Sequence, residues 1–448
     1  MLRVRMVQLF TLGETEVVML SNRLENGSRV GVIGGGPAGS FFALFLLKYA
    51  RAKGVDLEVD IYEWRSFSDP GPKGCNRCAG ILSASLLKNL KELDLVVPEE
   101  VIRVHISSYY LHSPFGVIHV DNPDPGAEIL SVFRGGGPWH NPGEKMASFD
   151  GFLIEQARSQ GASVQARRVQ QVRVFPRPGV VLDDGIRPYD LLVLASGLNS
   201  GSVEVKGPLY SPATTLTMSQ DELYVRKEDI QEYFGTGVRV FLIPHSDLVF
   251  GTLVPKGNFI NVSLLGKGGP PDLEGFLDHD IVRRAMPFPY QRSCGCRPRI
   301  AVGMASRYYT DGFVAVGDAA VSRLYKDGIG SAFLTARKAA QVALYHGVSR
   351  GDFHKHYAPF TRALHHDNLL GHLLFALHHR TKDSSPFFRA HSRLIDSERS
   401  LSAPAQVFSR VLWGMFTGSY TYREIWGMVA DAGAIARLAQ EYVKEKLT

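Results

Sequence analysis

The stretch that decides the fold reads RVGVIGGGPAGSFFALFLLKYARA and spans residues 29–52. Arg29–Ile33 has the apolar pattern of a buried strand, and Pro37–Ala52 has that of a helix packed on a sheet. Between them stands Gly34-x-Gly36-x-x-Gly39, whose glycines permit a tight turn and close approach of a pyrophosphate. The helix would start at Pro37 and Ala38, with its positive end facing that negative charge. These features predict a dinucleotide-binding site.

An acidic residue follows at the expected distance. Leu57–Glu63 alternates as a second strand, and Glu63 ends it 24 positions after Gly39. A carboxylate in this place accepts hydrogen bonds from a ribose hydroxyl. We therefore count Glu63, and Trp64 beside it, among the predicted cofactor contacts.

A second glycine signature lies late in the chain and identifies the dinucleotide. Gly317-Asp318 follows the buried strand pattern Gly312–Val316, and Gly328-Ile329-Gly330 opens another helix. Asp318 is suited to bind ribityl hydroxyls, and the helix start would stabilise reduced flavin at the isoalloxazine ring. The predicted cofactor is therefore FAD. No second Gly-x-Gly-x-x-Gly follows a strand, so NAD(P)H or another reductant would bind only transiently as electron donor.

The order of patterns predicts an α/β fold in which an FAD-binding Rossmann-type domain is interleaved with an antiparallel β-sheet substrate domain and followed by a helical C-terminal region. The predicted segments are an N-terminal extension (1–27), the FAD-binding domain (28–100, 131–207 and 301–350), the substrate domain (101–130 and 208–300) and the helical region (351–448).

Composition excludes several classes of protein. The net charge is only +6 over 448 residues, and no basic patch with interleaved aromatic residues suggests nucleic-acid binding. No apolar run reaches the roughly 20 residues that a membrane span requires. Met1–Gly27 lacks the pattern of a secretory signal, and either Met1 or Met19 fits as the start. We expect a cytoplasmic protein, with peripheral contact to anionic membranes left open.

Several motifs resemble the p-hydroxybenzoate-hydroxylase-like flavoproteins, and within them the geranylgeranyl reductases. The similarity runs from about Ser28 to Gly351 and includes Val30–Gly39, Ile61-Tyr62-Glu63, Ser131-Val132-Phe133-Arg134, Phe149–Leu153 and Gly312–Gly330. The resemblance implies FAD, with Arg134 contacting the flavin and Gly317-Asp318 binding it.

The resemblance also has two departures. Ser196-Gly197 stands where the hydroxylases usually carry Asp-Gly, and Thr252 replaces a Trp of the reductase pattern. It implies a reductase that transfers hydride between flavin and a bulky apolar, isoprenoid-like substrate. The alternatives are an FAD-dependent monooxygenase and an electron-transfer flavoprotein that serves a redox partner protein.

The four cysteines form two close pairs, Cys75-x-x-Cys78 and Cys294-x-Cys296. Three interpretations stay open: a zinc or iron–sulfur site with Cys75, Cys78, Cys294 and Cys296 as ligands, a dithiol that exchanges electrons with flavin, and unreactive buried thiols. In the resemblance, Cys78 occupies a Cys-Gly loop near the flavin, so we predict it as a catalytic residue that donates a proton or electrons.

Aromatic residues are dense near the C-terminus. Two roles fit this pattern: packing the tail onto the body, or lining a tunnel for a lipid substrate or a membrane contact. The residues concerned are Trp413, Met415, Phe416, Tyr420, Tyr422 and Trp426.

Overall fold

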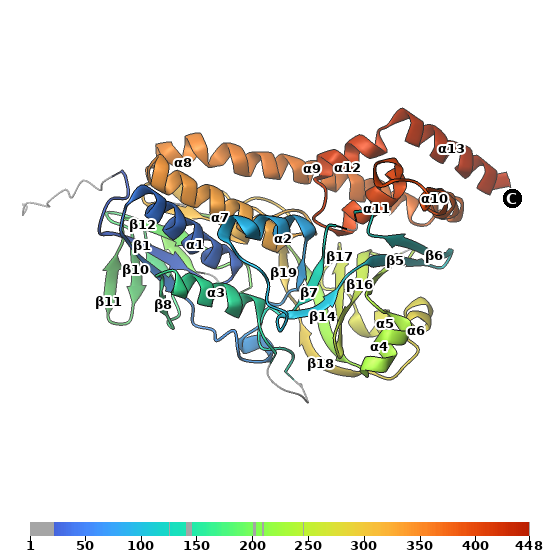
Figure 1. Cartoon of the computed structure of the whole chain (residues 1–448), viewed down its shortest axis with the longest axis horizontal. Helices are drawn as coiled ribbons and strands as arrows, with labels where there is room; N and C mark the ends of the chain where they lie inside the picture. The colour runs from blue at the N-terminus through green and yellow to red at the C-terminus, as the bar shows by residue number, and fades with distance from the viewer. Residues whose placement is uncertain are drawn as a thin grey trace, which may run out of the picture.

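The computed structural model describes residues 22–124, 126–139, 146–199, 203–207, 210–244 and 246–447. The predicted fold class is confirmed: a mostly parallel α/β layer, a large antiparallel sheet and a helical C-terminal region lie along one elongated molecule (Figure 1). Most of the predicted N-terminal extension, including Met1 and Met19, lies outside the described residues.

A six-stranded sheet forms the centre of the α/β layer. The first strand pairs in parallel with its neighbours on both sides, as a dinucleotide-binding sheet requires. Only β20 runs antiparallel, at one edge. The strand order is β20 (Tyr309–Thr310), β21 (Phe313–Ala315), β12 (Leu191–Leu194), β1 (Ser28–Ile33), β2 (Leu57–Tyr62) and β8 (Ser163–Gln165).

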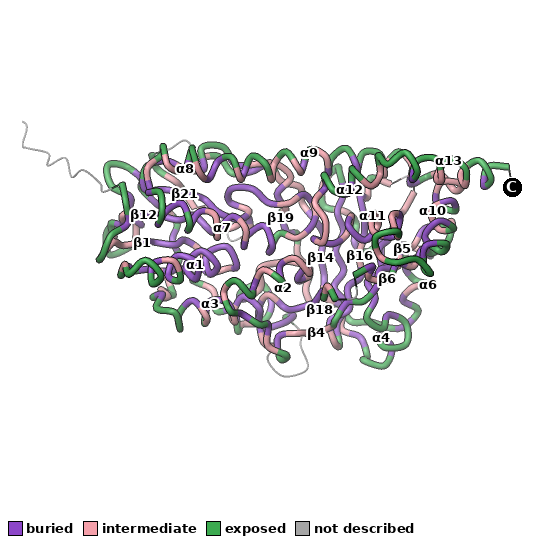
Figure 2. Tube along the Cα trace, turned by 45° about the horizontal axis from the view of Figure 1, so that its top comes forward, coloured by how far each residue is buried: buried purple, intermediate pink, exposed green. Residues whose placement is uncertain are grey.

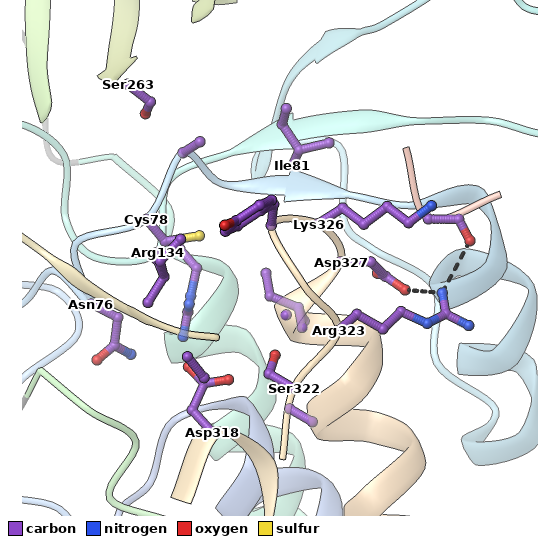
Figure 3. A pocket seen from close by; sticks show the side chains of 18 of the residues that line it. Asn76, Cys78, Ile81, Arg134, Ser263, Asp318, Ser322, Arg323, Lys326 and Asp327 are labelled. Atoms are coloured by element: carbon purple, nitrogen blue, oxygen red, sulfur yellow. Dashed lines mark hydrogen bonds and ion pairs between the residues drawn. The ribbon is translucent and has the colours of Figure 1, made fainter. Parts of the chain in front are cut away.

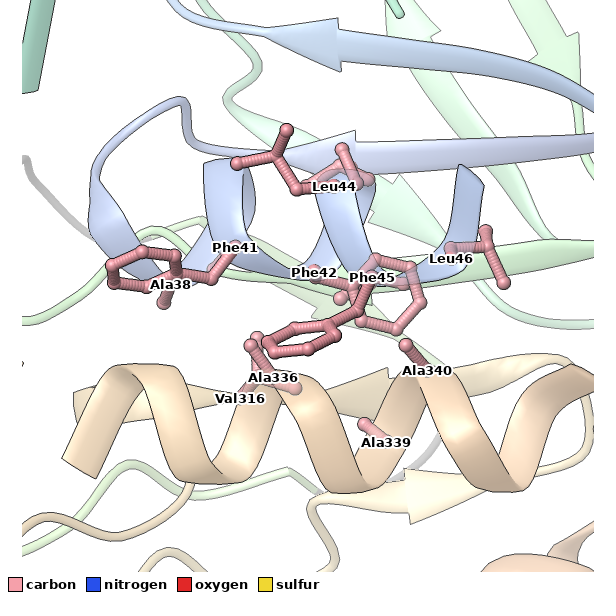
Figure 4. Packing of buried hydrophobic residues seen from close by; sticks show 14 of the residues in the cluster. Ala38, Phe41, Phe42, Leu44, Phe45, Leu46, Val316, Ala336, Ala339 and Ala340 are labelled. Carbon is pink, nitrogen blue, oxygen red and sulfur yellow. The ribbon is translucent and has the colours of Figure 1, made fainter. Parts of the chain in front are cut away.

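Two long helices pack against each other beside this sheet (Figure 4). α1 (Pro37–Lys53) begins with proline in its first turn, where no amide hydrogen is needed, and ends at Gly54 in the left-handed conformation. Phe41 and Phe45 of α1 each meet Phe333 of α7 (Gly328–Tyr345) edge to face, with ring centroids 5.0 Å apart. α3 (Phe149–Ser159) also contacts α1.

The second body is built on an antiparallel sheet that takes strands from both halves of the chain. Helices α4 (Lys227–Tyr233), α5 (Leu273–Asp278) and α6 (Asp280–Ala285) contribute to one core on this sheet. The C-terminal helices share a second core with it. The strand order is β18 (Gln291–Cys296), β14 (Thr215–Tyr224), β17 (Phe259–Gly266), β16 (Leu248–Lys256), β15 (Gly237–Phe241), β5 (Ser108–Ser113) and β6 (Gly116–Asp121), with β19 (Arg299–Ala301) paired to β14.

Two small sheets complete the architecture. One lies between the two bodies: its central strand precedes Arg134, two of its strands contact β16 of the antiparallel sheet, and its first strand follows the cysteine loop. It contains β3 (Ile81–Leu82), β7 (Leu130–Val132) and β4 (Ile102–His105). The other contains β11 (Gly185–Pro188), β10 (Gly179–Leu182), β9 (Gln171–Arg173) and β13 (Glu204–Lys206). Helix α2 (Ala84–Leu90) follows β3.

The C-terminal helices run along one long edge of the molecule, where much of the trace is exposed (Figure 2). Among the described residues, no helix is long and apolar enough to cross a membrane. The helices are α8 (Arg350–His356), α9 (Ala358–Thr381), α10 (Ser385–Glu398), α11 (Val407–Phe416), α12 (Tyr422–Val429) and α13 (Ala432–Leu447).

Candidate functional site

The glycine turn between β1 and α1 has the geometry that the motif predicts. Gly34 has φ +108°, and a Cβ there would lie 2.5 Å from the carbonyl oxygen of Ala195. A Cβ on Gly39 would lie 1.9 Å from the carbonyl oxygen of Gly34, so only glycine lets the helix approach the turn this closely. Gly36 caps α1 without a side-chain hydrogen bond. The positive start of the helix is therefore left for an anion.

A large cavity opens at this turn and continues between the two bodies of the molecule. Its empty volume is about 1720 Å³, including the space at its open mouth. Among the predicted cofactor contacts, its lining includes Gly36, Pro37, Ala38, Arg134, Asp318, Gly328 and Ile329, and the predicted catalytic residue Cys78 lines it as well.

Arg134 is held in the cavity wall by a buried ion pair. Its Nε and Nη2 donate to the two carboxylate oxygens of Asp150 at 2.7 and 2.8 Å. Burial disfavours the charged guanidinium, but Asp150, and after it Cys78, more than offset this effect and raise the pKa of Arg134. Cys78 and Arg134 lie side by side (Figure 3). A permanent positive charge is thus fixed where the flavin is predicted.

The wall continues as a chain of polar side chains that sequence patterns did not single out. Asn76 donates to Asp150 and accepts from Arg65, and Arg65 Nε donates to Glu63 at 3.1 Å. Arg65 and Asn76 both line the cavity. Their only signal in the sequence is that they flank predicted features, Arg65 after Glu63 and Asn76 between two cysteines.

Glu63 and Trp64 do not line the cavity. The Glu63 carboxylate accepts from the amide of Gly35 at 3.0 Å and from that of Arg65 at 3.0 Å, so it supports the glycine turn from behind. Trp64 is 42% exposed, and the guanidinium groups of Arg65 and Arg168 lie near its ring. Direct contact of either residue with the cofactor stays a prediction.

The late glycine signature meets the early one in space. Gly317 has φ +61°, and a Cβ on it would lie 2.7 Å from that of Ala38, so this turn packs directly on the start of α1. Asp318 lines the cavity, and burial raises the pKa of its carboxyl. Gly330 does not line the cavity. A Cβ on it would lie 2.3 Å from the carboxylate of Asp327, so this glycine makes room for that side chain.

A second buried charge cluster lies at the start of α7. Asp327 accepts from Ser83 Oγ at 2.7 Å and from Arg323 Nη1 at 2.8 Å. Beside it, Lys326 Nζ donates to the carbonyl oxygens of Gly414 and Tyr420 at 2.6 and 3.0 Å. Burial, followed by the charge of Arg323, lowers the pKa of Lys326 to about 7. Figure 3 shows these side chains along the cavity wall, where they tie the loop before α7 to the C-terminal region.

The far part of the cavity is an apolar chamber, formed by the antiparallel sheet and α11. Tyr109 lies edge to face with Trp413 at 5.1 Å and stacks with Phe416 at 6.2 Å. The Tyr109 hydroxyl is buried and has no hydrogen-bond partner among the described residues, and burial raises its pKa. The chamber is lined by Tyr109, Ile129, Met218, Val238, Phe250, Thr252, Ile300, Tyr325, Met415 and Phe416, and by the polar side chains of Gln220 and Ser263.

The four cysteines surround a second, smaller cavity with an empty volume of about 550 Å³. Cys78 lines both cavities, and all four side chains are partly exposed free thiols. In the described part of the chain, no three His, Cys, Asp or Glu side chains converge so that they could hold a metal ion. The prediction of a zinc ion bound by these four cysteines is therefore not supported, and the predicted iron–sulfur cluster is likewise not shown by the described residues.

The pKa values of the cysteine thiols do not support the dithiol hypothesis either. Burial raises the pKa of Cys294 to about 11 and that of Cys296 to about 12, and it raises the pKa of Cys75. A reactive dithiol ordinarily has a lowered pKa. The proton-donating or redox role of Cys78 stays a prediction.

Comparison with known proteins identifies the fold. No family model and no curated protein matches the sequence. Among solved structures, the chain is similar to a geranylgeranyl bacteriochlorophyll reductase-like protein from Thermoplasma acidophilum, with 17% identity, coverage of 94% of this chain and 100% of that chain, and a TM-score of 0.61. It is also similar to a flavoprotein/dehydrogenase from Cytophaga hutchinsonii, with 15% identity, coverage of 94% and 99%, and a TM-score of 0.60.

A third similar structure is p-nitrophenol 4-monooxygenase from Pseudomonas putida DLL-E4, with 15% identity, coverage of 89% of this chain and 100% of that chain, and a TM-score of 0.59. These likenesses show that the chain has the fold of the p-hydroxybenzoate-hydroxylase-like flavoproteins, and the predicted resemblance is confirmed at that level.

Proposed function

We propose that the protein is an FAD-dependent oxidoreductase that transfers hydride between flavin and a bulky apolar substrate of isoprenoid-like character. One observation carries the proposal: the two glycine signatures meet at one cavity, and that cavity continues into a chamber with a mainly apolar lining. The fold it shares with solved flavoproteins supports the cofactor.

The residues present fit FAD. The start of α1 at Gly36 would hold the pyrophosphate, Asp318 the ribityl chain, and the start of α7 at Gly328 the flavin ring. FAD, when bound, supplies the hydride chemistry. Arg134 would place its guanidinium near the ring, where negative charge increases on reduction, and Asp150 keeps that guanidinium in place.

The chamber supports an apolar substrate. Rings from the sheet and from α11 enclose it, with Phe250 and Phe416 edge to face at 6.5 Å. Such walls exclude water from the reacting atoms and position a substrate by apolar contact. The unpartnered Tyr109 hydroxyl is a hydrogen-bond donor for a single polar group of that substrate.

A monooxygenase is the main enzymatic alternative, because one of the similar structures is a monooxygenase. Ser196-Gly197 at the cavity, in place of the Asp-Gly of the hydroxylases, favours the reductase. Oxygen consumption separates the two. The reductase proposal expects slow oxygen uptake that apolar substrates do not stimulate, and rapid substrate-stimulated uptake with NADPH would refute it.

The direct test uses the FAD-loaded protein, reduced with dithionite under anaerobic conditions and mixed with a geranylgeranyl-bearing alkene. We expect the flavin absorbance to return as the alkene is saturated, with product detected by mass spectrometry. Phe416→Ala should slow this reoxidation, whereas Leu373→Ala should not, because Leu373 is an exposed residue of α9 outside the chamber. Failure of every prenyl substrate to reoxidise the flavin would contradict the substrate class.

A further inference from the structure

All four cysteines of the chain face one cavity, although they come from two segments far apart in the sequence. Cys75 and Cys78 lie in the loop after β2, and Cys294 and Cys296 lie in β18. The two β18 positions are two residues apart, so their side chains fall on the same face of the strand. Burial of unreactive thiols does not require this arrangement, because four separate apolar positions would serve equally well.

Backbone amides point at three of the four sulfur atoms. Cys75 Sγ accepts from the amide of Arg77 at 3.1 Å, and Cys78 Sγ accepts from that of Gly80 at 3.4 Å. Cys294 Sγ accepts from the amide of Trp139 at 2.9 Å. Amide hydrogen bonds of this kind stabilise a sulfur that carries negative charge, and they tune metal–sulfur clusters.

The first two of these hydrogen bonds repeat one local turn. In each, the donor lies two residues after the cysteine and has a left-handed backbone, with φ 52° at Arg77 and φ 72° at Gly80. A non-glycine residue rarely adopts this conformation, so the turn at Arg77 is held at a cost in backbone energy. The turns aim amide hydrogens at sulfur in both halves of Cys75-x-x-Cys78, and such hydrogen bonds stabilise thiolate ligands.

Positive charge lies next to the same sulfur atoms. Lys256 and Arg77 line the cysteine cavity, and Lys256 Nζ is buried and paired with Glu222 Oε1 at 3.0 Å. Asp221 and Glu222 line it as well, so the cavity carries charges of both signs. The cations offset part of the negative charge of a cluster with thiolate ligands.

We propose that these four cysteines bind an iron–sulfur cluster that passes electrons to the flavin. A cube of iron and sulfide spreads its four ligands farther apart than a single ion does. Among the described residues, the four cysteines line one cavity without three of them converging on a single point, an arrangement that suits a cluster better than one zinc ion. In this assignment Cys78 is a cluster ligand and not a proton donor.

The place of the cavity defines the role of the cluster. Cys78, Arg134 and Gln220 line both the cysteine cavity and the cavity assigned to FAD, so the two share a wall. A reduced one-electron donor protein would give one electron to the cluster at a time. Two such transfers, with two protons from solvent, reduce one flavin by two electrons. This electron-delivery role rests on the proposed function, whereas cluster binding does not.

The test is iron and acid-labile sulfide analysis of the full-length protein, purified without oxygen and reconstituted with ferrous iron and sulfide. We expect equal iron and sulfide, about two or four of each per chain, and an electron paramagnetic resonance signal after dithionite reduction. Cys75→Ser and Cys294→Ser should each lose more than four-fifths of the iron. Ser293→Ala is the matched control, because Ser293 is buried beside Cys294 and its hydroxyl has no partner among the described residues.

Three results would overturn the proposal: four titratable thiols with no iron in the reconstituted wild-type protein, zinc without sulfide, or unchanged iron in both serine variants. Circular dichroism reports whether each variant is folded, and the wild-type analysis decides the question even if the variants are not. FAD is extracted and counted in the same samples. Flavin without a cluster refutes this inference alone, and a cluster without flavin refutes the proposed function alone.

Discussion

The ion pair between Arg134 and Asp150 offers the sharpest test of how the cavity wall is built. The Asp150 side chain is fully buried, that of Arg134 is 12% exposed, and the two share paired hydrogen bonds of 2.7 and 2.8 Å. Asp150→Asn keeps the shape of the side chain and removes its charge. Since the guanidinium is then buried without a counter-charge, we expect a loss of about 3–5 kcal/mol in the free energy of unfolding.

The assay is thermal unfolding followed by circular dichroism at two FAD concentrations. At about 2–4 °C per kcal/mol for a folding unit of 150–250 residues, the midpoint should fall by roughly 6–20 °C. Two ligand concentrations separate weakened flavin binding from intrinsic destabilisation, because bound ligand raises the midpoint with the logarithm of the ratio of free ligand to its Kd. Asp184→Asn is the matched control: Asp184 pairs with Arg167 at 3.0 Å on the exposed surface. We expect no measurable change there, and equal midpoints for the two variants would refute the reasoning.

Three further predictions follow from single side chains in the cavity. Phe416→Ala should raise KM for an apolar substrate about 10- to 150-fold by removing a ring that lines the chamber, with flavin content unchanged; a change in flavin content alone would contradict this. Tyr109→Phe should lower kcat/KM about 2- to 12-fold and leave stability equal or higher, since its hydroxyl has no hydrogen-bond partner among the described residues. Lys326, whose pKa is lowered to about 7, binds fewer protons when folded than when unfolded between pH 7 and its ordinary pKa. Wild-type stability should therefore rise with pH in that window by up to about 1.4 kcal/mol per pH unit relative to Lys326→Met, and parallel pH profiles would refute this.

Sequence can predict those parts of the site in which residues close together in the chain must be small for steric reasons. Gly34 and Gly39 are predictable because only glycine fits a turn this close, and the structure shows which atoms a side chain would meet. Gly317 follows the same logic. Their strand and helix flanks are contiguous, so apolar periodicity locates them.

The wall of the cavity could not be predicted, because its members meet only in the folded chain. Asn76 and Asp150 come from a loop and a helix, and nothing local to either one indicates that they form a hydrogen bond. Glu63 shows that a motif can locate a residue without defining its contacts. The motif predicts that its carboxylate binds a ribose hydroxyl, but in the structure the carboxylate accepts a hydrogen bond from the backbone amide of Gly35.

The sequence predicts that aromatic residues and cysteines form sites, but it does not predict where in the fold the chamber and the cysteine cavity lie. The aromatic cluster near the C-terminus predicts either core packing or a substrate tunnel, and its members serve both roles. Trp413 is buried in the core, while Phe416 lines the chamber. Pairing of Cys75 with Cys78 and of Cys294 with Cys296 suggested a shared site. Their spacing around a cavity, which excludes convergence on one ion, depends on tertiary structure.

Flavin stoichiometry tests the central claim most directly. The absorption spectrum of the purified protein after incubation with FAD and removal of free FAD should show one flavin per chain. Gly39→Ala should bind none, because its Cβ would lie 1.9 Å from the carbonyl oxygen of Gly34. A folded wild-type protein that retains no flavin, or a Gly39→Ala variant that retains it fully, would contradict the account.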